Sequence, residues 1–297
     1  MSRCPRCDDA GYVTRPGERW AEARVCRHLA SCPQCHGRGL TIANDAAGHA
    51  LAAPCACPIF SVAKRVDLFN RAKIPARFAS SRIDTYVYRD HGGTQFRVKG
   101  VFSELCETFA PGARGVGLSG DPGVGKTHLL TALCGFFALE LGLEVRYTDF
   151  ADLIGELRAG FERGGGAETL VGTVVDAPVL FVDELGKGRA TEWEQSIVDA
   201  IISRRYSRGL TLFFATNYGL DDRLDALDRE PLQVRIGPRA ASRLREMCRF
   251  EAIIGPDGRE LQAQTMERPG AQAAVKARPT SAPEPPKRAP AGMQRVR

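Results

Sequence analysis

The sequence lacks the long uninterrupted apolar run that a membrane-spanning helix needs. Its most apolar stretch, LLTALCGFFALELGL, contains Thr131 and Glu140 and is too short to cross a bilayer comfortably. A basic and then apolar leader is also missing, because Arg3, Asp8 and Asp9 interrupt any such run. We therefore expect a cytoplasmic protein without a membrane partner.

The chain also lacks a strong overall charge. The formal net charge is +6, and residues 58–265 hold 27 basic and 28 acidic side chains. Residues 266–297, rich in Pro and Ala, carry seven Lys/Arg and two acidic residues, and we expect them to form a disordered tail. Nonspecific attraction to nucleic acid should therefore come from the ends or from local patches.

A disulfide framework is not expected in a reducing cytoplasm, so the ten cysteines need another role. Seven of them fall within the first 57 residues, where the phrase CPRCDDAGYV returns as CPQCHGRGLT. Alignment of the phrases gives two blocks of four N/S ligands, the number that closes a tetrahedral structural zinc site. The blocks are Cys4, Cys7, Cys26 and His28, then Cys32, Cys35, Cys55 and Cys57.

This pattern predicts two structural Zn²⁺ ions and a small domain over 1–60 that has no conventional core without metal. The spacing leaves open whether each block holds its own ion or the blocks exchange ligand pairs in a cross-braced arrangement. A catalytic zinc is disfavoured because a closed four-ligand shell leaves no position for water. A redox role is disfavoured because no thioredoxin-like βαβ pattern surrounds either C-x-x-C. We expect this domain to dock a partner protein or nucleic acid.

From about residue 61 to 263, short apolar runs alternate with helical patterns, which predicts an α/β fold with a parallel sheet between helices. Strands are expected at GVGLSG, LEVRYTDF, PVLFVDE and LTLFFATN, and helices at KTHLLTALCGFFALEL and TEWEQSIVDAIISRRYSRG. The run 179–182 has no polar alternation, which is typical of a central strand that is buried on both faces.

The stretch GDPGVGKTH fits the phosphate-binding pattern G-x-x-x-x-G-K-[ST] and lies between a predicted strand and a predicted helix. Its glycines let backbone N–H groups surround phosphates, Lys126 reaches the β- and γ-phosphates, and the Thr127 hydroxyl binds Mg²⁺. The residues expected to bind ATP here are Gly120, Pro122, Gly123, Val124, Gly125, Lys126, Thr127 and His128.

Polar side chains follow the next buried strands. Asp183 and Glu184 end PVLFVDE, and strand ends in such sheets face the ligand crevice. Asp183 is expected to hold Mg²⁺ together with Thr127, and Glu184 to align or activate the attacking water. Asn217 ends LTLFFATN, where its amide is expected to hold that water in a sensor role.

Arginines late in the sequence are further candidates for contact with the nucleotide. In GPRAASRLREMC, Arg239 and Arg243 lie four residues apart on one face of an expected helix. Arg243 is favoured as an arginine finger toward a neighbouring subunit, because Leu244 and Met247 would fix the helix; a pair of surface arginines is the alternative. Arg259, just before the expected final strand ELQ, is the second candidate.

A resemblance to a known family rests on the order of five stretches: GDPGVGKTHLL, LFVDELG, TEWEQSIVDAIISRRY, FFATNY and RAASRLREMC. Over about residues 71–263 the chain resembles the AAA+ ATPases of the bacterial helicase-loader and transposition-helper group, DnaC, DnaI and IstB. The stretch RAKIPARFASSRIDTY is similar to the linker before their core. The sequence departs from the loaders at Asp183-Glu184, where they often have two aspartates.

The resemblance implies a P-loop AAA+ core, ATP hydrolysis, homo-oligomers with shared ATP sites, contact with single-stranded DNA and attachment to a replicative helicase. It gives Lys126 and Thr127 the Walker A role and Asp183-Glu184 the Walker B role. It also makes Asn217 sensor 1, Arg243 the finger and Arg259 a possible sensor 2. The expected organisation is a zinc domain at 1–60, a linker at 61–80, an AAA+ ATPase domain at 81–265 and the tail at 266–297.

The leading hypothesis is an ATP-hydrolysing DNA replication accessory protein that loads a replicative helicase onto single-stranded DNA. The alternatives are a transposition helper ATPase and a zinc adaptor that uses ATP as an assembly switch with little turnover. A small-molecule kinase is disfavoured because no acceptor site is visible. Four arginines are candidate DNA contacts or else solvated helix residues: Arg158, Arg163, Arg204 and Arg205.

Overall fold

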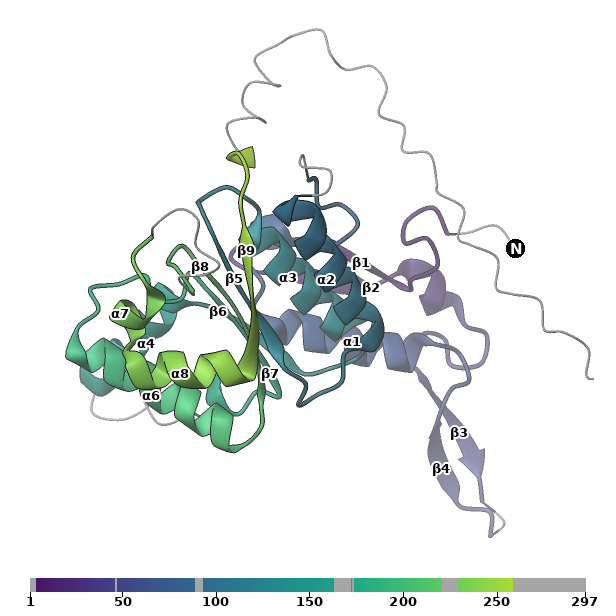
Figure 1. Cartoon of the computed structure of the whole chain (residues 1–297). Helices are drawn as coiled ribbons and strands as arrows, with labels where there is room; N and C mark the ends of the chain where they lie inside the picture. Colours follow the sequence, from purple (N-terminus) through teal and green to yellow (C-terminus); the bar gives the residue numbers. More distant parts are fainter. Residues whose placement is uncertain are drawn as a thin grey trace, which may run out of the picture. The chain divides into compact units, whose positions relative to one another are not determined.

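A five-stranded sheet lies at the centre of the fold, with its strands in the order β6-β7-β8-β5-β9 (Figure 1). The computed structural model describes residues 4–45, 47–88, 93–162, 172, 174–220 and 229–258. All neighbouring strands of this sheet are parallel, which confirms the predicted fold class. The strands are β5 (Gly115–Gly120), β6 (Val145–Asp149), β7 (Val179–Asp183), β8 (Thr211–Thr216) and β9 (Cys248–Ile253).

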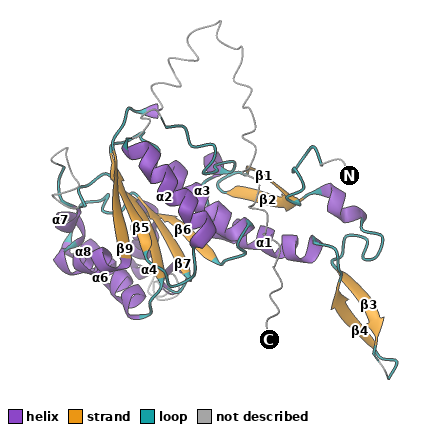
Figure 2. Ribbon diagram, turned by 45° about the vertical axis from the view of Figure 1, so that its right-hand side comes forward, coloured by secondary structure: helices purple, strands orange, loops and turns teal. Residues whose placement is uncertain are grey.

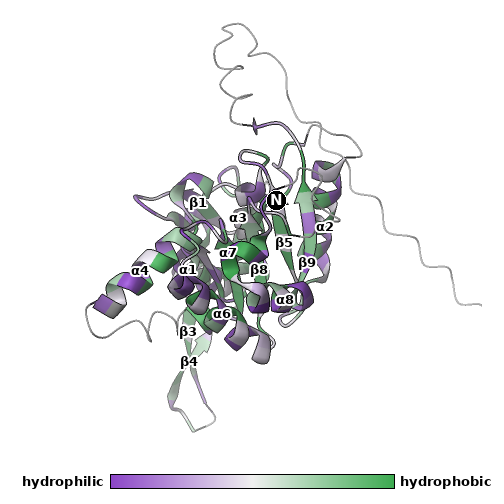
Figure 3. Cartoon of the chain, turned by 60° about the vertical axis from the view of Figure 1, so that its left-hand side comes forward, coloured by the Kyte–Doolittle hydropathy of each residue, from purple (hydrophilic) through white to green (hydrophobic). Residues whose placement is uncertain are grey.

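Helices cover both faces of the sheet (Figure 2). Val179 and Phe181 of β7 enter the core under α1, α2 and α3, whereas Leu180 and Val182 enter the core under α4, α6, α7 and α8. Burial on both faces explains the unbroken apolar run of β7, and β5 and β8 are likewise hydrophobic (Figure 3). The helices are α1 (Ile59–Ala72), α2 (Thr94–Thr108), α3 (Lys126–Leu139), α4 (Phe150–Glu162), α6 (Glu192–Ser207), α7 (Leu232–Ile236) and α8 (Pro238–Met247).

The N-terminal region contains two antiparallel hairpins. They are β1 (Tyr12–Pro16) with β2 (Ala21–Val25), and β3 (Leu40–Asn44) with β4 (Ala50–Pro54). Short 3-10 helices lie at Arg27–Ser31 and Ala76–Phe78.

The first hairpin packs on α1 and shares its hydrophobic core. Ala21 and Ala23 are buried in the cluster that contains Val62 of α1 and Phe137 of α3. The Asn70 side chain accepts a hydrogen bond from the N–H of Ala23 (2.7 Å) and donates one to its carbonyl oxygen (3.2 Å). The expectation that this region has no conventional core was therefore wrong for β1–β2, because alanines create no visible apolar period.

The segment expected to be a linker, 61–80, contains most of α1 and the second 3-10 helix. The division of the chain into domains stays a prediction. Three predicted features lie outside the described residues: Arg163, Arg259 with the expected strand ELQ, and the tail at 266–297. No helix in the described part of the chain combines the length and apolarity needed to cross a membrane.

Arg205 is wholly buried at the end of α6, so the hypothesis that it contacts DNA was wrong. Its guanidinium donates hydrogen bonds to the carbonyl oxygens of Val175 and Ala177, each at 2.8 Å, and of Thr211 at 2.5 Å. Burial lowers the pKa of Arg205 to about 10. The side chain joins the loop before β7 to the start of β8. By contrast, Arg204 is exposed, and its Nη2 lies 3.4 Å from Oδ1 of Asp176.

Replacing this buried cation should cost stability. Arg205→Met is expected to lower the free energy of unfolding by about 3 kcal/mol, because several carbonyl groups lose their donor in a dry site. Denaturant unfolding measures the change. The matched variant Arg204→Met should change stability by only about 0.5 kcal/mol or less, since that side chain is exposed. Equal effects of the two variants would contradict this account.

Candidate functional site

A glycine-containing loop joins β5 to α3. Gly123 and Gly125 have φ angles of 83° and 97°, in the left-handed region that favours glycine. A Cβ on Gly125 would lie 2.4 Å from Cε2 of Tyr86, so a side chain cannot fit there. The loop ends where Lys126 begins α3, so the helix N-terminus and the loop N–H groups together suit an anionic phosphate.

Lys126 is a buried cation in this loop. Its ammonium donates hydrogen bonds to the carbonyl oxygens of Gly120 (2.7 Å) and Asp121 (2.9 Å). Burial lowers the pKa of Lys126 to about 8, the charge of Asp183 opposes this shift, and the charge of Arg229 adds to it. Lys126 is therefore a cation at the position where phosphates are expected.

Asp183 lies at the end of β7 and is buried. Its Oδ2 accepts a hydrogen bond from the Tyr147 hydroxyl (2.8 Å), and its Oδ1 accepts one from the N–H of Glu184 (3.0 Å). Burial raises the pKa of Asp183, while hydrogen bonds from Thr127 and Tyr147 lower it. The structure therefore brings together Thr127 and Asp183, the two residues predicted to hold Mg²⁺.

Tyr147 is a positioning residue that the sequence did not reveal. It lies on β6, next to β7, and its hydroxyl holds one oxygen of Asp183. Tyr147→Phe is expected to raise the Mg²⁺ concentration for half-maximal ATP hydrolysis about tenfold, since a hydrogen bond to a charged group contributes about 1.5–3 kcal/mol. A Mg²⁺ titration of the hydrolysis rate checks this, and an unchanged midpoint would reject it.

Glu184 follows β7 in a strained conformation. Its φ is 53°, which is unusual for a residue with a side chain and is typical of functional sites. Its carboxylate forms an ion pair with Lys187. Asp149 of β6 is paired in register with Asp183, and burial raises the pKa of Asp149, with the charges of Glu184 and Asp183 adding to the shift. Three carboxylates therefore gather at one edge of the sheet.

Asn217 comes directly after β8, the strand between the P-loop strand β5 and β7. The Thr216 hydroxyl donates to the carbonyl oxygen of Leu185 (2.7 Å), and the N–H of Leu185 donates to the carbonyl oxygen of Ala215 (2.8 Å). These bonds fix the end of β8 against the loop that carries Glu184. The sensor role of Asn217 stays a prediction.

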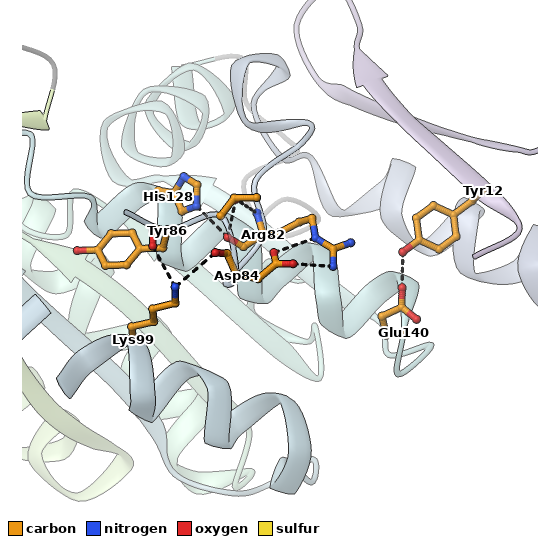
Figure 4. A network of polar contacts seen from close by, with 8 residues as sticks. Tyr12, Arg82, Asp84, Tyr86, Lys99, His128 and Glu140 are labelled. Carbon is orange, nitrogen blue, oxygen red and sulfur yellow. Dashed lines mark hydrogen bonds and ion pairs between the residues drawn. The ribbon is translucent and has the colours of Figure 1, made fainter. Parts of the chain in front are cut away.

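The segment before α2 braces the P-loop, and its contacts with Lys99 and His128 are drawn in Figure 4. The Tyr86 hydroxyl donates to the carbonyl oxygen of Val124 (2.9 Å), and Lys99 donates to that of Tyr86 (3.1 Å). Nε2 of His128 lies 2.9 Å from the carbonyl oxygen of Arg82, so this predicted ATP-binding residue also contacts the bracing segment.

The chain after β9 passes across the P-loop. The N–H of Gly258 donates to the carbonyl oxygen of Gly123 (3.1 Å). A Cβ on Gly123 would lie 1.9 Å from Oδ1 of Asp257, so the carboxylate packs directly on this glycine. The next residue along the chain is Arg259, whose sensor role stays a prediction outside the described residues.

Arg243 lies on α8 and pairs with a residue of its own chain. Its Nη1 is 2.9 Å from Oδ1 of Asp199 on α6, and the side chain is partly exposed. This contact holds Arg243 on the α6–α8 side of the sheet. The arginine-finger role of Arg243 requires a neighbouring subunit and stays a prediction.

The eight predicted metal ligands form two groups, each of which could hold a metal ion. In the first, Cys4 and Cys26 Sγ atoms lie 3.9 Å apart and Cys7 Sγ lies 3.5 Å from His28 Nδ1. In the second, the Sγ distances are 3.8 Å for Cys32–Cys55 and 3.5 Å for Cys35–Cys57. The grouping is tandem and not cross-braced.

The same backbone hydrogen bond occurs in both groups, just as the cysteine motif occurs twice in the sequence. The N–H of Cys26 donates to the carbonyl oxygen of Gly11 (2.8 Å), and the N–H of Cys55 donates to the carbonyl oxygen of Gly39 (2.9 Å). All ligand atoms within each group lie within 4.8 Å of one another. Sets of three thiols with one imidazole and of four thiols are donor sets that suit Zn²⁺.

Comparisons with known proteins place this site in a family. The family model described as IstB-like ATP binding protein matches residues 64–231, a range that includes the P-loop, Asp183 and Asn217 but neither cysteine group. The replicative helicase loader DnaC of Escherichia coli (strain K12) is 25% identical over 171 residues, which cover 57% of this chain and 69% of DnaC.

The crystal structure of the DnaC helicase loader superimposes with a TM-score of 0.52 at 30% identity, covering 60% of this chain and 98% of that chain. The uncharacterized protein YqaM of Bacillus subtilis (strain 168) is 28% identical over 144 residues, 47% of this chain and 42% of YqaM. The chain thus spans less than half the length of that relative. Because the family model covers more than half of this chain and includes the P-loop, the chain belongs to the IstB-like ATP-binding family.

Proposed function

We propose that the protein is a Mg²⁺-dependent ATPase of DNA replication that loads a replicative helicase onto single-stranded DNA. The observation that carries this proposal is the convergence of Lys126, Thr127 and Asp183 at one edge of the sheet, within the region that is similar to the helicase loader DnaC. The 30% identity to that structure supports a related activity for this chain.

Each residue of the site has its own role in ATP hydrolysis. The P-loop N–H groups and Lys126 bind the phosphates, and Thr127 and Asp183 hold Mg²⁺, which neutralises phosphate charge when bound. Glu184 orients or deprotonates the attacking water, and Asn217 positions it. Arg243 acts on the ATP of a neighbouring subunit in a homo-oligomer, and Arg259 acts as sensor 2.

The N-terminal cysteine groups hold two structural Zn²⁺ ions. The tandem grouping and the donor sets support this assignment. A closed four-ligand shell supplies folding energy rather than chemistry. The region that the ions stabilise serves to dock the helicase.

A transposition helper is the second candidate, favoured by the family description itself, which names IstB. Direct binding to purified partners separates the two. Under the first proposal, the protein binds the replicative helicase encoded in the same genome, in an ATP-dependent way, and not a transposase. Binding to a transposase alone would favour the second candidate and reject the first.

A further inference from the structure

The hairpin β3–β4 extends away from the sheet and its helices in both views (Figures 1 and 2). No residue of either strand is buried. Cys32 and Cys35 precede the hairpin, Cys55 and Cys57 follow it, and the N–H of Cys55 donates to Gly39 at its base. The second metal group therefore lies at the base of the hairpin, where β3 begins and β4 ends, and fixes the two strands as one arm.

Large apolar side chains on this arm are exposed. The exposed fractions are 44% for Leu40, 81% for Ile42 and 53% for Leu51. Ile42 lies opposite Ala52 and Leu40 opposite Pro54, so these four side chains share one face, whereas Leu51 lies on the other. Both faces of the arm therefore expose large apolar side chains that a partner could cover.

The strand edges are also unprotected. In the described residues the hairpin pairs with no third strand. Soluble proteins usually place Lys or other charged side chains on free strand edges, yet residues 40–44 and 50–54 contain no charged residue. The arm can therefore accept an added strand as well as apolar contacts.

The near absence of charge on the arm indicates which class of partner it binds. Residues 39–57 contain no Lys or Arg, and Asp45 is their only acidic residue. Its Oδ1 accepts hydrogen bonds from the N–H groups of Ala47 and His49, both at 2.9 Å. Nucleic acids bind through cations that neutralise phosphates, so a surface without cations suits an apolar protein partner instead.

We propose that the β3–β4 hairpin docks on a different protein, with Leu40 and Ile42 on one face and Leu51 on the other each contacting apolar side chains of that protein. This inference rests on the proposed function, so the occupant is the replicative helicase encoded in the same genome. The hairpin binds the helicase, and the second metal group holds the hairpin rigid so that little ordering cost remains on binding.

The test compares full-length variants in binding to that purified helicase. Ile42→Thr combined with Leu51→Thr keeps strand-compatible side chains but removes the apolar contacts. The double variant is expected to bind about tenfold or more weakly, since buried apolar anchors dominate interface affinity. Val234→Thr, a change on α7 with a similar exposed fraction of 52%, is the matched control and should bind as wild type does. Zinc content and melting temperature show that all variants fold.

Equal helicase binding by wild type and the double variant would overturn the docking surface while leaving the proposed function intact. No helicase binding by wild type would overturn both. A wild-type dimer in analytical ultracentrifugation that the double variant loses would also overturn the inference, because the hairpin would then bind a second copy of this chain. Equal weakening by Val234→Thr would likewise reject a specific role for the hairpin.

Discussion

Glu184→Gln is expected to reduce ATP hydrolysis by about 10²–10⁴-fold, the usual contribution of a general base, while ATP binding persists. The amide is nearly the same size as the carboxylate but cannot accept the proton of the attacking water. Lys126→Ala is expected to reduce binding and hydrolysis together, because Lys126 is the cation at the phosphates. Fluorescent-nucleotide binding beside phosphate release separates the two effects.

Lys187→Gln is the control for this pair of variants. It removes the ion pair with Glu184 but leaves the carboxylate in place, so most activity should remain. Equal hydrolysis rates for wild type, Glu184→Gln and Lys126→Ala would reject the ATPase assignment. Such a result would favour a zinc adaptor in which ATP acts only as an assembly switch.

Removal of metal should have effects that differ between the two cysteine groups. Small zinc domains gain about 10–16 kcal/mol of apparent folding free energy from the ion, so loss of an ion should unfold its surroundings. The first group is adjacent to β1–β2, which packs into the core with α1 and α3. Cys26→Ser is therefore expected to lower the melting temperature of the core around the five-stranded sheet, whereas Cys55→Ser should unfold only the β3–β4 arm.

Metal analysis and calorimetry check this prediction. Wild type should contain two zinc ions per chain, and each serine variant should contain one. Cys106→Ser, outside both groups, is the control and should keep two ions. Fewer than about one zinc per cysteine group in wild type would contradict the two-site assignment.

The parts of the site that depend on the spacing of residues close together in the sequence could be predicted. The P-loop needs glycines, Lys126 and Thr127 at fixed intervals, and its strand–loop–helix context was visible in the sequence. The buried run of β7 placed Asp183 at a strand end, where the structure confirms that it lies.

Features that depend on packing between distant segments were not predictable. The contact of Tyr147 with Asp183 requires the register of β6 against β7, and no local pattern encodes that register. Arg205 lies in an otherwise polar last turn of α6, and its burial depends on carbonyl groups of the distant loop before β7 and of the first residue of β8. The spacing of the cysteines predicted the two blocks of ligands, but only the fold showed that the blocks are tandem and not cross-braced.

The most direct test of the central claim measures helicase loading onto circular single-stranded DNA, which has no end for a ring to thread. Purified helicase is mixed with the DNA and ATP, with or without this protein, and DNA-bound helicase is isolated by gel filtration. We predict that wild type increases the bound helicase and that Lys126→Ala does not. An equal amount of bound helicase with wild type, with Lys126→Ala and without the protein would contradict the account.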